Sequence, residues 1–534
     1  MTSLSRRSFV ALSGAASAGA FVAAIGAVPA VASPSPQGPS ASDAAVAPRA
    51  REFRAMWIAS TDNIDYPSRT GLSVEESKAE FIAWLDLAKE LNLNAVISQI
   101  RPAADAFWPS PYEPWSQFLT GEQGKDPGFD PLAFQIEEAH KRNLEFHAWY
   151  NPFRVSMTES VDHLVPDHPA LVNEGWAWAY GTKTYFDPGI PEVREHSLRA
   201  IMHSVEHYDI DAVHFDDYFY PYKVEGKDYP DQATYERYSD GTSSRDDWRR
   251  ENITIFIREM RERIRSCKPW VKFGISPFGI WRNNTSDPAG SATSGSESYE
   301  IICADSRAWV KDGLVDYINP QIYWPIGLEV ADYAALVPWW NDVVEGTDVA
   351  LYIGQAMYKQ ASGAIEDPEE MARHLDFNRD YPRVEGDVYF SAKSVRDERD
   401  GAMGKVYERH YAHPAIVPVI AHMGGAAPRT PNGLKVRCSR GNAVVEFNRH
   451  PHSEATSFAI YRVSGARFDP AELADGRNLL ACARADEQVV RQSVHVEGVA
   501  GGDWIVVTAL DRLWNESDPS KPARTLTGAS MQLG

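Results

Sequence analysis

The chain has 534 residues, of which 43% are hydrophobic, 11% aromatic and 24% charged. This balance excludes a disordered, collagen-like or coiled-coil protein, and the length suffices for two domains or for one large α/β barrel with an appendage. The formal net charge is -21, so we expect neither nucleic acid nor an anionic membrane surface as a partner. The four cysteines are scattered and form no CxxC pair, which excludes a disulfide scaffold and a zinc ribbon.

The N-terminal stretch is typical of an export signal followed by a linker. Arg6 and Arg7 precede a long Ala/Gly/Val-rich run without charge, and small residues at 30–32 match the site that signal peptidase cleaves. Glycines and a proline in this run disfavour the alternative of a membrane anchor. The sequence therefore predicts a twin-arginine signal peptide over 1–32 and a Pro/Ser/Ala-rich linker over 33–50. We expect an extracellular, periplasmic or cell-wall location, with no stable membrane insertion after cleavage.

Residues 51–427 alternate short apolar runs with segments of helical periodicity. The runs predict eight strands, over 54–60, 94–100, 145–150, 212–217, 272–276, 316–323, 349–355 and 387–391. Helical patterns lie between them, for example over 77–91, 131–142, 191–207 and 246–266. Short buried strands separated by helices pair in parallel, so eight such units predict an α/β fold of the (β/α)8 TIM-barrel class. The active site of such a barrel lies at the carboxyl ends of its strands.

From residue 428 to 534 the pattern changes to all β. Apolar and polar residues alternate, without intervening helices, over 443–447, 457–463, 493–496 and 504–510. About a hundred residues with this pattern predict a small fibronectin type III-like sandwich. Cys438 and Cys482 both fall in it, either as a disulfide formed after export or as two buried free thiols. All barrel strand ends precede residue 425, so we expect the module to be dispensable for bond cleavage.

Six blocks at the predicted strand ends carry unusual polar and aromatic residues. They are Arg54-Ala55-Met56-Trp57-Ile58, Asn63-Ile64-Asp65-Tyr66-Pro67, Gln99-Ile100-Arg101-Pro102, Trp149-Tyr150-Asn151-Pro152-Phe153-Arg154, His214-Phe215-Asp216-Asp217-Tyr218 and Asn319-Pro320-Gln321-Ile322-Tyr323-Trp324. In this order they resemble the glycosyl hydrolase-like 10 family, secreted barrel proteins associated with bacterial cell-wall glycans. The resemblance covers about residues 52–425. It implies hydrolysis of a cell-wall polysaccharide, with peptidoglycan as the expected substrate.

Asp216 and Asp217 are the best-placed acids for such chemistry. Glycoside hydrolysis needs a proton donor to the leaving oxygen and a group that attacks or stabilises the oxocarbenium-like carbon. Strand alternation directs Phe215 toward the helices and both His214 and Asp216 into the barrel mouth. Asp217 reaches the cleft only if the strand has ended before it. We predict that both acids are catalytic.

The identity of a second catalytic group on another strand stays open, because the next three predicted strand ends carry no acid. A two-carboxylate mechanism would need Asp62 or Asp105, although Asp105 also has the spacing to pair with Arg101. We interpret Asp187 as a cap of the helix that begins near Pro191.

Adjacent acids at one strand end instead resemble the pair of substrate-assisted hexosaminidases. In those enzymes the N-acetyl oxygen of the sugar attacks the anomeric carbon, while one acid orients the amide and its neighbour protonates the leaving group. Peptidoglycan sugars carry this N-acetyl group, so the mechanism agrees with the substrate that the resemblance implies.

Other residues near the strand ends are predicted to contact the sugar through hydrogen bonds or ring stacking. They are Arg101, Asp105, Tyr150, Asn151, Arg154, His214, Tyr218, Asn319, Gln321, Tyr323 and Trp324. Trp281 is a further stacking candidate, although each aromatic residue also fits the upper barrel core. Arg101 and Arg154 also suit the lactyl carboxylate of a muramic acid without its stem peptide.

Two other protein classes stay open. The acid pair, together with His203 and His207, has the residue types of a metal-dependent polysaccharide deacetylase. Those histidines, however, belong to the opposite end of the barrel, about 17 Å away for roughly five strand residues at ~3.3 Å each. We therefore expect no metal and no cofactor. A non-catalytic glycan-binding barrel is the second alternative, and it is favoured if Asp216 is buried and paired.

Overall fold

The computed structural model describes residues 47–525. The predicted signal peptide and most of the predicted linker lie outside this range. Within 47–525, no helix is both long and apolar enough to cross a membrane.

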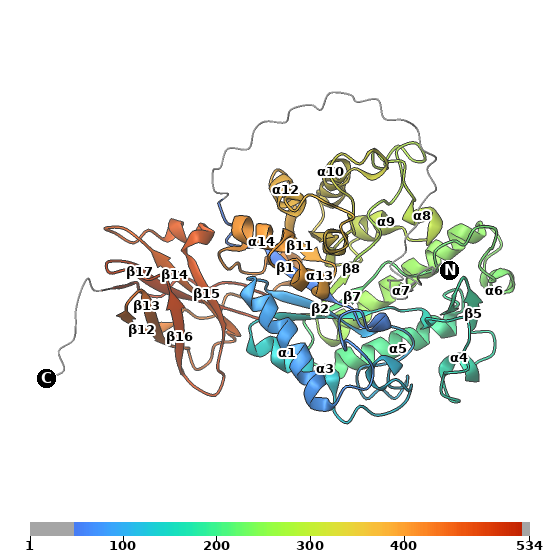
Figure 1. The fold of residues 1–534 in the computed structure, drawn as a ribbon, viewed down its shortest axis with the longest axis horizontal. Helices are drawn as coiled ribbons and strands as arrows, with labels where there is room; N and C mark the ends of the chain where they lie inside the picture. Colours follow the sequence, from blue (N-terminus) through green and yellow to red (C-terminus); the bar gives the residue numbers. More distant parts are fainter. Residues whose placement is uncertain (1–46, 526–534) are drawn as a thin grey trace, which may run out of the picture. The chain divides into compact units, whose positions relative to one another are not determined.

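Eight parallel strands close into a barrel, which confirms the predicted fold class (Figure 1). In order around the barrel they are β1 (Phe53–Ile58), β11 (Val384–Tyr389), β10 (Ala350–Gln355), β9 (Tyr317–Ile318), β8 (Lys272–Ile275), β7 (Ala212–Phe215), β3 (Glu145–Tyr150) and β2 (Ala95–Arg101). Only β9 is much shorter than predicted. Pro320 has no N–H to donate to a neighbouring strand, and the chain beyond it pairs only through single bridges at Gln321.

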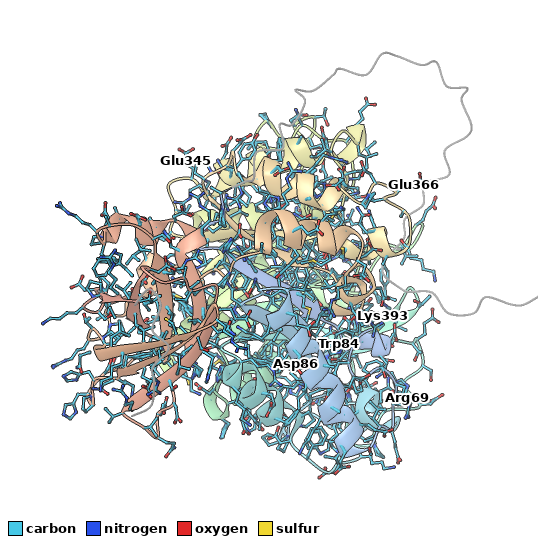
Figure 2. All side chains as sticks on the ribbon, turned by 60° about the vertical axis from the view of Figure 1, so that its left-hand side comes forward. Arg69, Trp84, Asp86, Glu345, Glu366 and Lys393 are labelled. Atoms are coloured by element: carbon cyan, nitrogen blue, oxygen red, sulfur yellow. The ribbon has the colours of Figure 1, made fainter. Side chains whose placement is uncertain are left out.

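Helices between the strands cover the outside of the barrel (Figure 1). The longest are α1 (Val74–Glu90), α3 (Pro131–Lys141), α5 (Pro191–His207), α7 (Arg245–Cys267) and α10 (Tyr333–Val344). Local sequence fixes where they begin: Ser73 and Glu76 form a reciprocal capping box at the start of α1. The same helix is amphipathic, with Trp84 buried and Asp86 exposed (Figure 2).

The strands separate two apolar layers, as their alternation predicts. Outward side chains pack against the helices: the ring of Phe215 lies 5.7 Å from that of Phe256 on α7. Inward side chains fill the barrel itself, where Phe53 stacks on Tyr352 at 4.2 Å. This alternation decides which side chains of each strand end face the mouth.

A small antiparallel sheet, for which the sequence gives no clear pattern, follows β3. It contains β4 (Arg154–Ser156), β6 (Lys183–Phe186) and β5 (Ala177–Tyr180), in that order. The short helix α4 (Pro169–Val172) lies between β4 and β5 in the chain. The strands of this sheet are too short to show a clear period of two, so propensity alone did not reveal them.

The C-terminal residues form the predicted all-β module. One antiparallel sheet contains β12 (Asn432–Ser439), β13 (Asn442–Asn448) and β16 (Arg491–Glu497), and the other β15 (Leu479–Arg484), β14 (Ser457–Val463), β17 (Trp504–Leu510) and β18 (Ala523–Arg524). Cys438 and Cys482 lie in different sheets and both are free thiols. The disulfide interpretation is therefore wrong, and the thiol of Cys438 is exposed rather than buried.

The interior of the barrel and one face of this module share a single apolar core. Tyr317 and Tyr352 from the barrel belong to the same buried cluster as Tyr461, Leu510 and Trp514 from the module. Burial of this continuous surface stabilises barrel and module together, at roughly 25 cal/mol per Å² of apolar area removed from water.

Candidate active site

Asp216 lies at the barrel mouth, directly after the last residue of β7. Its carboxylate accepts hydrogen bonds from the Trp149 indole at 3.1 Å, from the Asn151 amide at 3.1 and 3.2 Å, and from the Tyr218 backbone at 3.0 Å. Burial raises the pKa of Asp216 to about 6; the Arg154 guanidinium opposes this shift and the Asp217 carboxylate adds to it. The group therefore exchanges its proton near neutral pH, which acid–base catalysis requires.

Asp217 also faces the mouth, because β7 ends at Phe215 and strand alternation no longer applies. Its two oxygens accept hydrogen bonds from the Tyr222 hydroxyl and, at 3.2 Å, from the Gln321 amide beyond β9. Burial raises the pKa of this carboxyl as well. Two neighbouring acids whose ionised forms are both disfavoured can divide one proton between them, so one can act as an acid while the other carries the charge.

Asp216 is only 5% exposed. A buried and paired Asp216 was expected to favour the alternative of a non-catalytic glycan-binding barrel. Its hydrogen-bond partners, however, are all neutral donors, so no bonded cation neutralises its ionised form. The carboxyl groups of Asp65 and Asp105 are also buried with raised pKa values, so burial alone does not identify the catalytic group.

Two cations flank the acid pair, both from the unpredicted sheet. The Arg154 guanidinium lies 4.7 Å from the ring centroid of Tyr218, and the Lys183 ammonium lies 6.0 Å from the same ring. Burial and the charge of Arg154 lower the pKa of Lys183 to about 8, against the attraction of Asp62 and Asp216. Lys183 could not be predicted from the sequence, since nothing in its spacing connects it with the strand ends.

Asn319, directly beyond β9, has hydrogen-bonding groups without partners in the described chain. Its side chain is fully buried, and neither its amide nitrogen nor its oxygen has a partner among the described residues. The Ser276 hydroxyl at the end of β8 and the Arg154 Nε are likewise buried and without partners within the described chain.

The predicted stacking residues divide into two groups. Tyr218, Tyr323 and Trp324 are half-buried near the strand ends, and Trp324 packs edge-on against Phe278 with 5.4 Å between centroids. Trp281 is buried, stacks on Trp339 at 6.0 Å and donates its indole N–H to Asp305. It belongs to the packing of the loops rather than to an open surface.

Four predicted contact residues have other partners, and we no longer expect them to bind sugar. Arg101 is fully buried, pairs with Glu113 and donates to the Asn151 backbone, so it holds a site residue in place. Asp105 lies beside that ion pair, and burial raises its pKa to about 7. Tyr150 faces the helices, with its hydroxyl 2.7 Å from Ser204 Oγ.

His214 is the fourth. It points into the barrel as predicted but lies below the mouth, hydrogen-bonded to Trp57 and Tyr317. Asp187 is also not a cap: α5 has Ile190 at its N-cap without a side-chain hydrogen bond. Asp187 instead accepts hydrogen bonds from the Gly189 backbone and the Thr234 hydroxyl.

The residues that suggested a deacetylase do not come together. His203 and His207 stack at 4.3 Å near the end of α5, and His203 accepts the indole N–H of Trp108 at 3.1 Å. Over residues 47–525, no group of three or more His, Cys, Asp or Glu side chains is arranged to hold a metal ion.

Comparison with known proteins gives one family and several relatives. The model of the glycosyl hydrolase-like 10 family matches residues 52–372. "Glycosyl hydrolase YngK" of Bacillus subtilis is 46% identical over 484 residues, 88% of this chain and 93% of that protein. "Glycosyl hydrolase DigH" of Escherichia coli K12 is 39% identical over 362 residues, 63% of this chain and 82% of that protein. The glycoside hydrolase domain of PgaB from Bordetella bronchiseptica aligns with 67% of this chain and 98% of its own, at 13% identity and a TM-score of 0.43.

Proposed function

The chain belongs to the glycosyl hydrolase-like 10 family and is a glycoside hydrolase, and we propose that its substrate is an N-acetylated cell-wall glycan, specifically peptidoglycan strands. The observation that carries this proposal is the pair Asp216 and Asp217, two adjacent buried acids with raised pKa values at one strand end. The two cations near this pair suit a substrate with a carboxylate group.

The catalytic roles follow from what a sugar with an N-acetyl group needs. The N-acetyl oxygen attacks the anomeric carbon as the glycosidic bond breaks, which forms an oxazoline-type ring and needs no protein nucleophile. One acid of the pair accepts a hydrogen bond from the amide N–H and balances its developing charge. The other donates its proton to the leaving oxygen, then takes a proton from the water that opens the ring. Preorganised donors such as Trp149 and Gln321 hold the two carboxyl groups in place.

The cations Arg154 and Lys183 support an acidic glycan over a neutral one. Arg154 is 3% exposed, so its charge acts in a poorly solvated environment. A lactyl carboxylate, free once the stem peptide has been removed, would pair with this guanidinium and with the half-buried ammonium of Lys183. Neutral chitin oligomers lack this group and should bind less tightly.

A comparison of N-acyl groups tests the mechanism. Replacing N-acetyl by N-trifluoroacetyl weakens the amide oxygen as a nucleophile, so kcat should fall steeply while the leaving group stays the same. Thiazoline mimics of the cyclised intermediate should inhibit strongly, because they resemble a state that the enzyme stabilises. A glycosyl-enzyme adduct trapped on Asp62, Asp105, Asp216 or Asp217 by a fluorinated sugar would contradict the mechanism and support the two-carboxylate alternative.

Leaving-group dependence then assigns the two acids. The variant that lacks the proton donor should retain activity on aryl glycosides with strongly acidic phenols, since these leave without protonation. The variant that lacks the amide-orienting acid should lose activity on every substrate. If both Asp216→Asn and Asp217→Asn respond equally to the leaving group, the division of roles is wrong.

Export by the twin-arginine route belongs to the same proposal and rests on the N-terminal sequence alone. Replacing both Arg6 and Arg7 by lysine should retain the protein in the cytoplasm, as followed by fractionation and immunoblotting. Unchanged export of this variant would contradict the route.

A further inference from the structure

A continuous chain of hydrogen bonds crosses the inside of the barrel. It runs from Trp57 to His214 (3.2 Å), to Tyr317 (3.0 Å), to His147 (2.9 Å) and to Glu145 (2.9 Å). At Glu145 it meets the C-terminal module, since Trp514 donates its indole N–H to the second carboxylate oxygen at 2.6 Å. Trp514 is the one member that the barrel does not supply.

One arrangement of protons satisfies every group in the chain. Glu145 only accepts, so His147 donates from Nε2 and accepts the Tyr317 hydroxyl at Nδ1. The Tyr317 oxygen then accepts from Nδ1 of His214, whose Nε2 accepts from Trp57. The imidazole of His214 is therefore neutral, which agrees with burial lowering its pKa well below the ordinary value.

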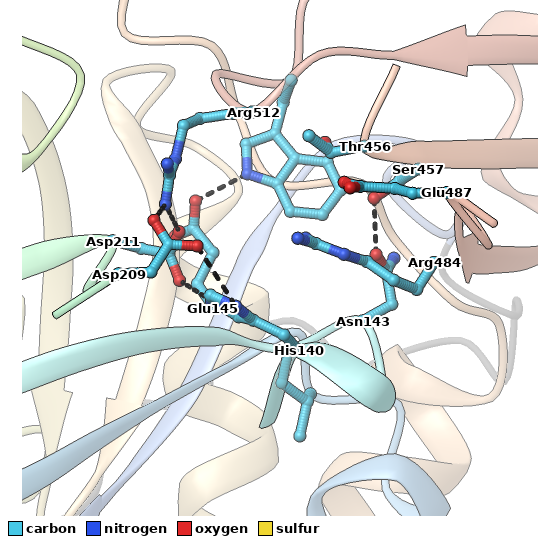
Figure 3. Close-up of a pocket in the computed structure, with 12 residues that line it drawn as sticks. His140, Asn143, Glu145, Asp209, Asp211, Thr456, Ser457, Arg484, Glu487 and Arg512 are labelled. Carbon is cyan, nitrogen blue, oxygen red and sulfur yellow. Dashed lines mark hydrogen bonds and ion pairs between the residues drawn. The ribbon is translucent and has the colours of Figure 1, made fainter. Parts of the chain in front are cut away.

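The Glu145 carboxylate, where the hydrogen-bond chain meets the C-terminal module, is held in its charged form. Burial opposes the ionisation of Glu145, but the Lys272 ammonium and the His147 donor outweigh it and keep the pKa of this carboxyl below its ordinary value. Glu145 lines a polar cavity of about 120 Å³ between barrel and module, together with Arg512, Asp209 and Asp211 (Figure 3). The chain thus has a fixed acceptor at one end and a fixed donor, Trp57, at the other.

This chain of hydrogen bonds lies one layer of side chains below the active site. Side chains two positions apart on a strand share a face, and three members precede a site residue by two positions. His147 precedes Trp149 on β3, His214 precedes Asp216 beyond β7, and Tyr317 precedes Asn319 beyond β9. Strands β3 and β7 are also joined above the chain, because Trp149 donates to Asp216.

We infer that His147, Tyr317, His214 and Trp514 are positioning residues, which set the register of the three strand ends that carry Asp216, Trp149 and Asn319. Through Trp514 the C-terminal module contributes to catalytic geometry without reaching the substrate. This inference rests on the proposed role of Asp216, but the chain of hydrogen bonds can be tested independently of activity.

Tyr317→Phe is the decisive variant, because it removes the central donor and acceptor and keeps the ring. We expect kcat to fall by about tenfold with KM within about twofold, since small displacements of reacting groups affect the chemical step. Tyr352→Phe is the matched control: its ring lies 5.3 Å from that of Tyr317 in the same core, and its hydroxyl takes no part in the chain. The control should keep wild-type kcat.

Trp514→Phe should lower kcat in the same direction, whereas Trp504→Phe, a tryptophan of β17 bonded to Gly465 within the module, should not. In the double variant of Trp514 and Tyr317 the losses should not add, because both interrupt one network. Fully additive losses, or an unchanged kcat per folded molecule in Tyr317→Phe, would overturn the inference.

Nitrogen-15 NMR of labelled histidines tests the chain without any substrate. His147 should carry a proton on Nε2 and His214 a proton on Nδ1, and His214 should stay neutral throughout pH 5 to 8, with the signals assigned by comparison with single His→Gln variants. A cationic His214, a His214 protonated on Nε2 or a His147 without a proton on Nε2 would overturn the inference even if the kinetic variants fail to fold. Correct tautomers in a wild-type protein that cleaves no glycan would instead contradict the proposed function alone.

Discussion

At the scale of single residues, the proposed chemistry depends on Asp216 and Asp217 and on the side chains that hold them, such as Asn151 and Gln321. The alternation rule places Asp216 inward because it depends only on period-two geometry. The same rule applied to Tyr150 gives the outward direction that the structure shows, so its inclusion among contact residues followed from its place in a motif rather than from geometry. Arg101 is occupied by Glu113, a partner from a loop whose path no local pattern indicates.

Removing either acid should abolish most of the activity. Loss of a general acid typically costs a factor of about 10²–10⁴, so Asp216→Asn and Asp217→Asn should each lower kcat by at least that order on unactivated substrates. Steady-state kinetics on soluble oligosaccharides, with circular dichroism as the check on folding, provides the measurement. Near-wild-type activity in Asp216→Asn would remove the pair from the mechanism.

Lys183 should make the binding of acidic glycans depend on pH. Its pKa is lowered to about 8, so its charge is present below that pH and is lost as pH rises through it. The KM for an acidic glycan should therefore increase above pH 8, and the KM for a neutral N-acetylated oligomer should not.

Lys183→Arg is the matched control for that measurement, because arginine keeps its charge throughout this range. Its KM for the acidic glycan should stay flat up to pH 9, whereas Lys183→Met should show the weak binding of the high-pH form at every pH. Equal pH profiles for acidic and neutral substrates would show that Lys183 does not contact the carboxylate.

At the scale of elements, long amphipathic helices and central strands were predictable and short edge strands were not. The pattern of α5 is complete enough to give its exact bounds, Pro191–His207. In contrast, β4, β5 and β6 are held by their pairing with one another, and such non-local pairing leaves little signal in a single short segment. The sheet that carries Arg154 and Lys183 was therefore the part of the site that the sequence could not reveal.

The glycine of β8 should be sensitive to any side chain. A Cβ on Gly274 would lie 2.0 Å from Cζ of the Tyr317 ring, and this ring is fixed in a packed interior. Overpacking of this kind costs about 1–3 kcal/mol, so Gly274→Ala should lower the unfolding free energy by at least that amount in denaturant titrations. Gly354→Ala in β10, whose nearest contact would be 3.0 Å, should cost less; the reverse order would contradict this packing.

At the scale of the whole chain, we expected the C-terminal module to be dispensable for bond cleavage, but its contacts with the barrel argue against this. The sequence separates barrel and module correctly by pattern, because helices stop and alternating strands begin. It does not show that both contribute to one apolar core, or that Arg512 of the module pairs with Asp209 and Asp211 of the barrel. Contacts between distant segments depend on the folded surfaces, which composition does not encode.

A chain that ends at residue 427 should therefore be unstable rather than simply lacking a wall-binding module. Truncation would expose the barrel side of the shared core and remove the Trp514 donor from the buried Glu145 carboxylate. We expect a lower melting temperature or aggregation, measured by scanning calorimetry and light scattering. A truncated protein with wild-type stability and turnover would show that the module is dispensable.

Mass spectrometry of a digest of peptide-free peptidoglycan strands tests the central claim most directly. The wild-type enzyme should release shorter saccharides with new reducing ends, and Asp216→Asn and Asp217→Asn should release almost none under the same conditions. If the folded wild-type protein produces no new reducing ends from these strands, from chitin oligomers or from other N-acetylated glycans, the proposed substrate is wrong.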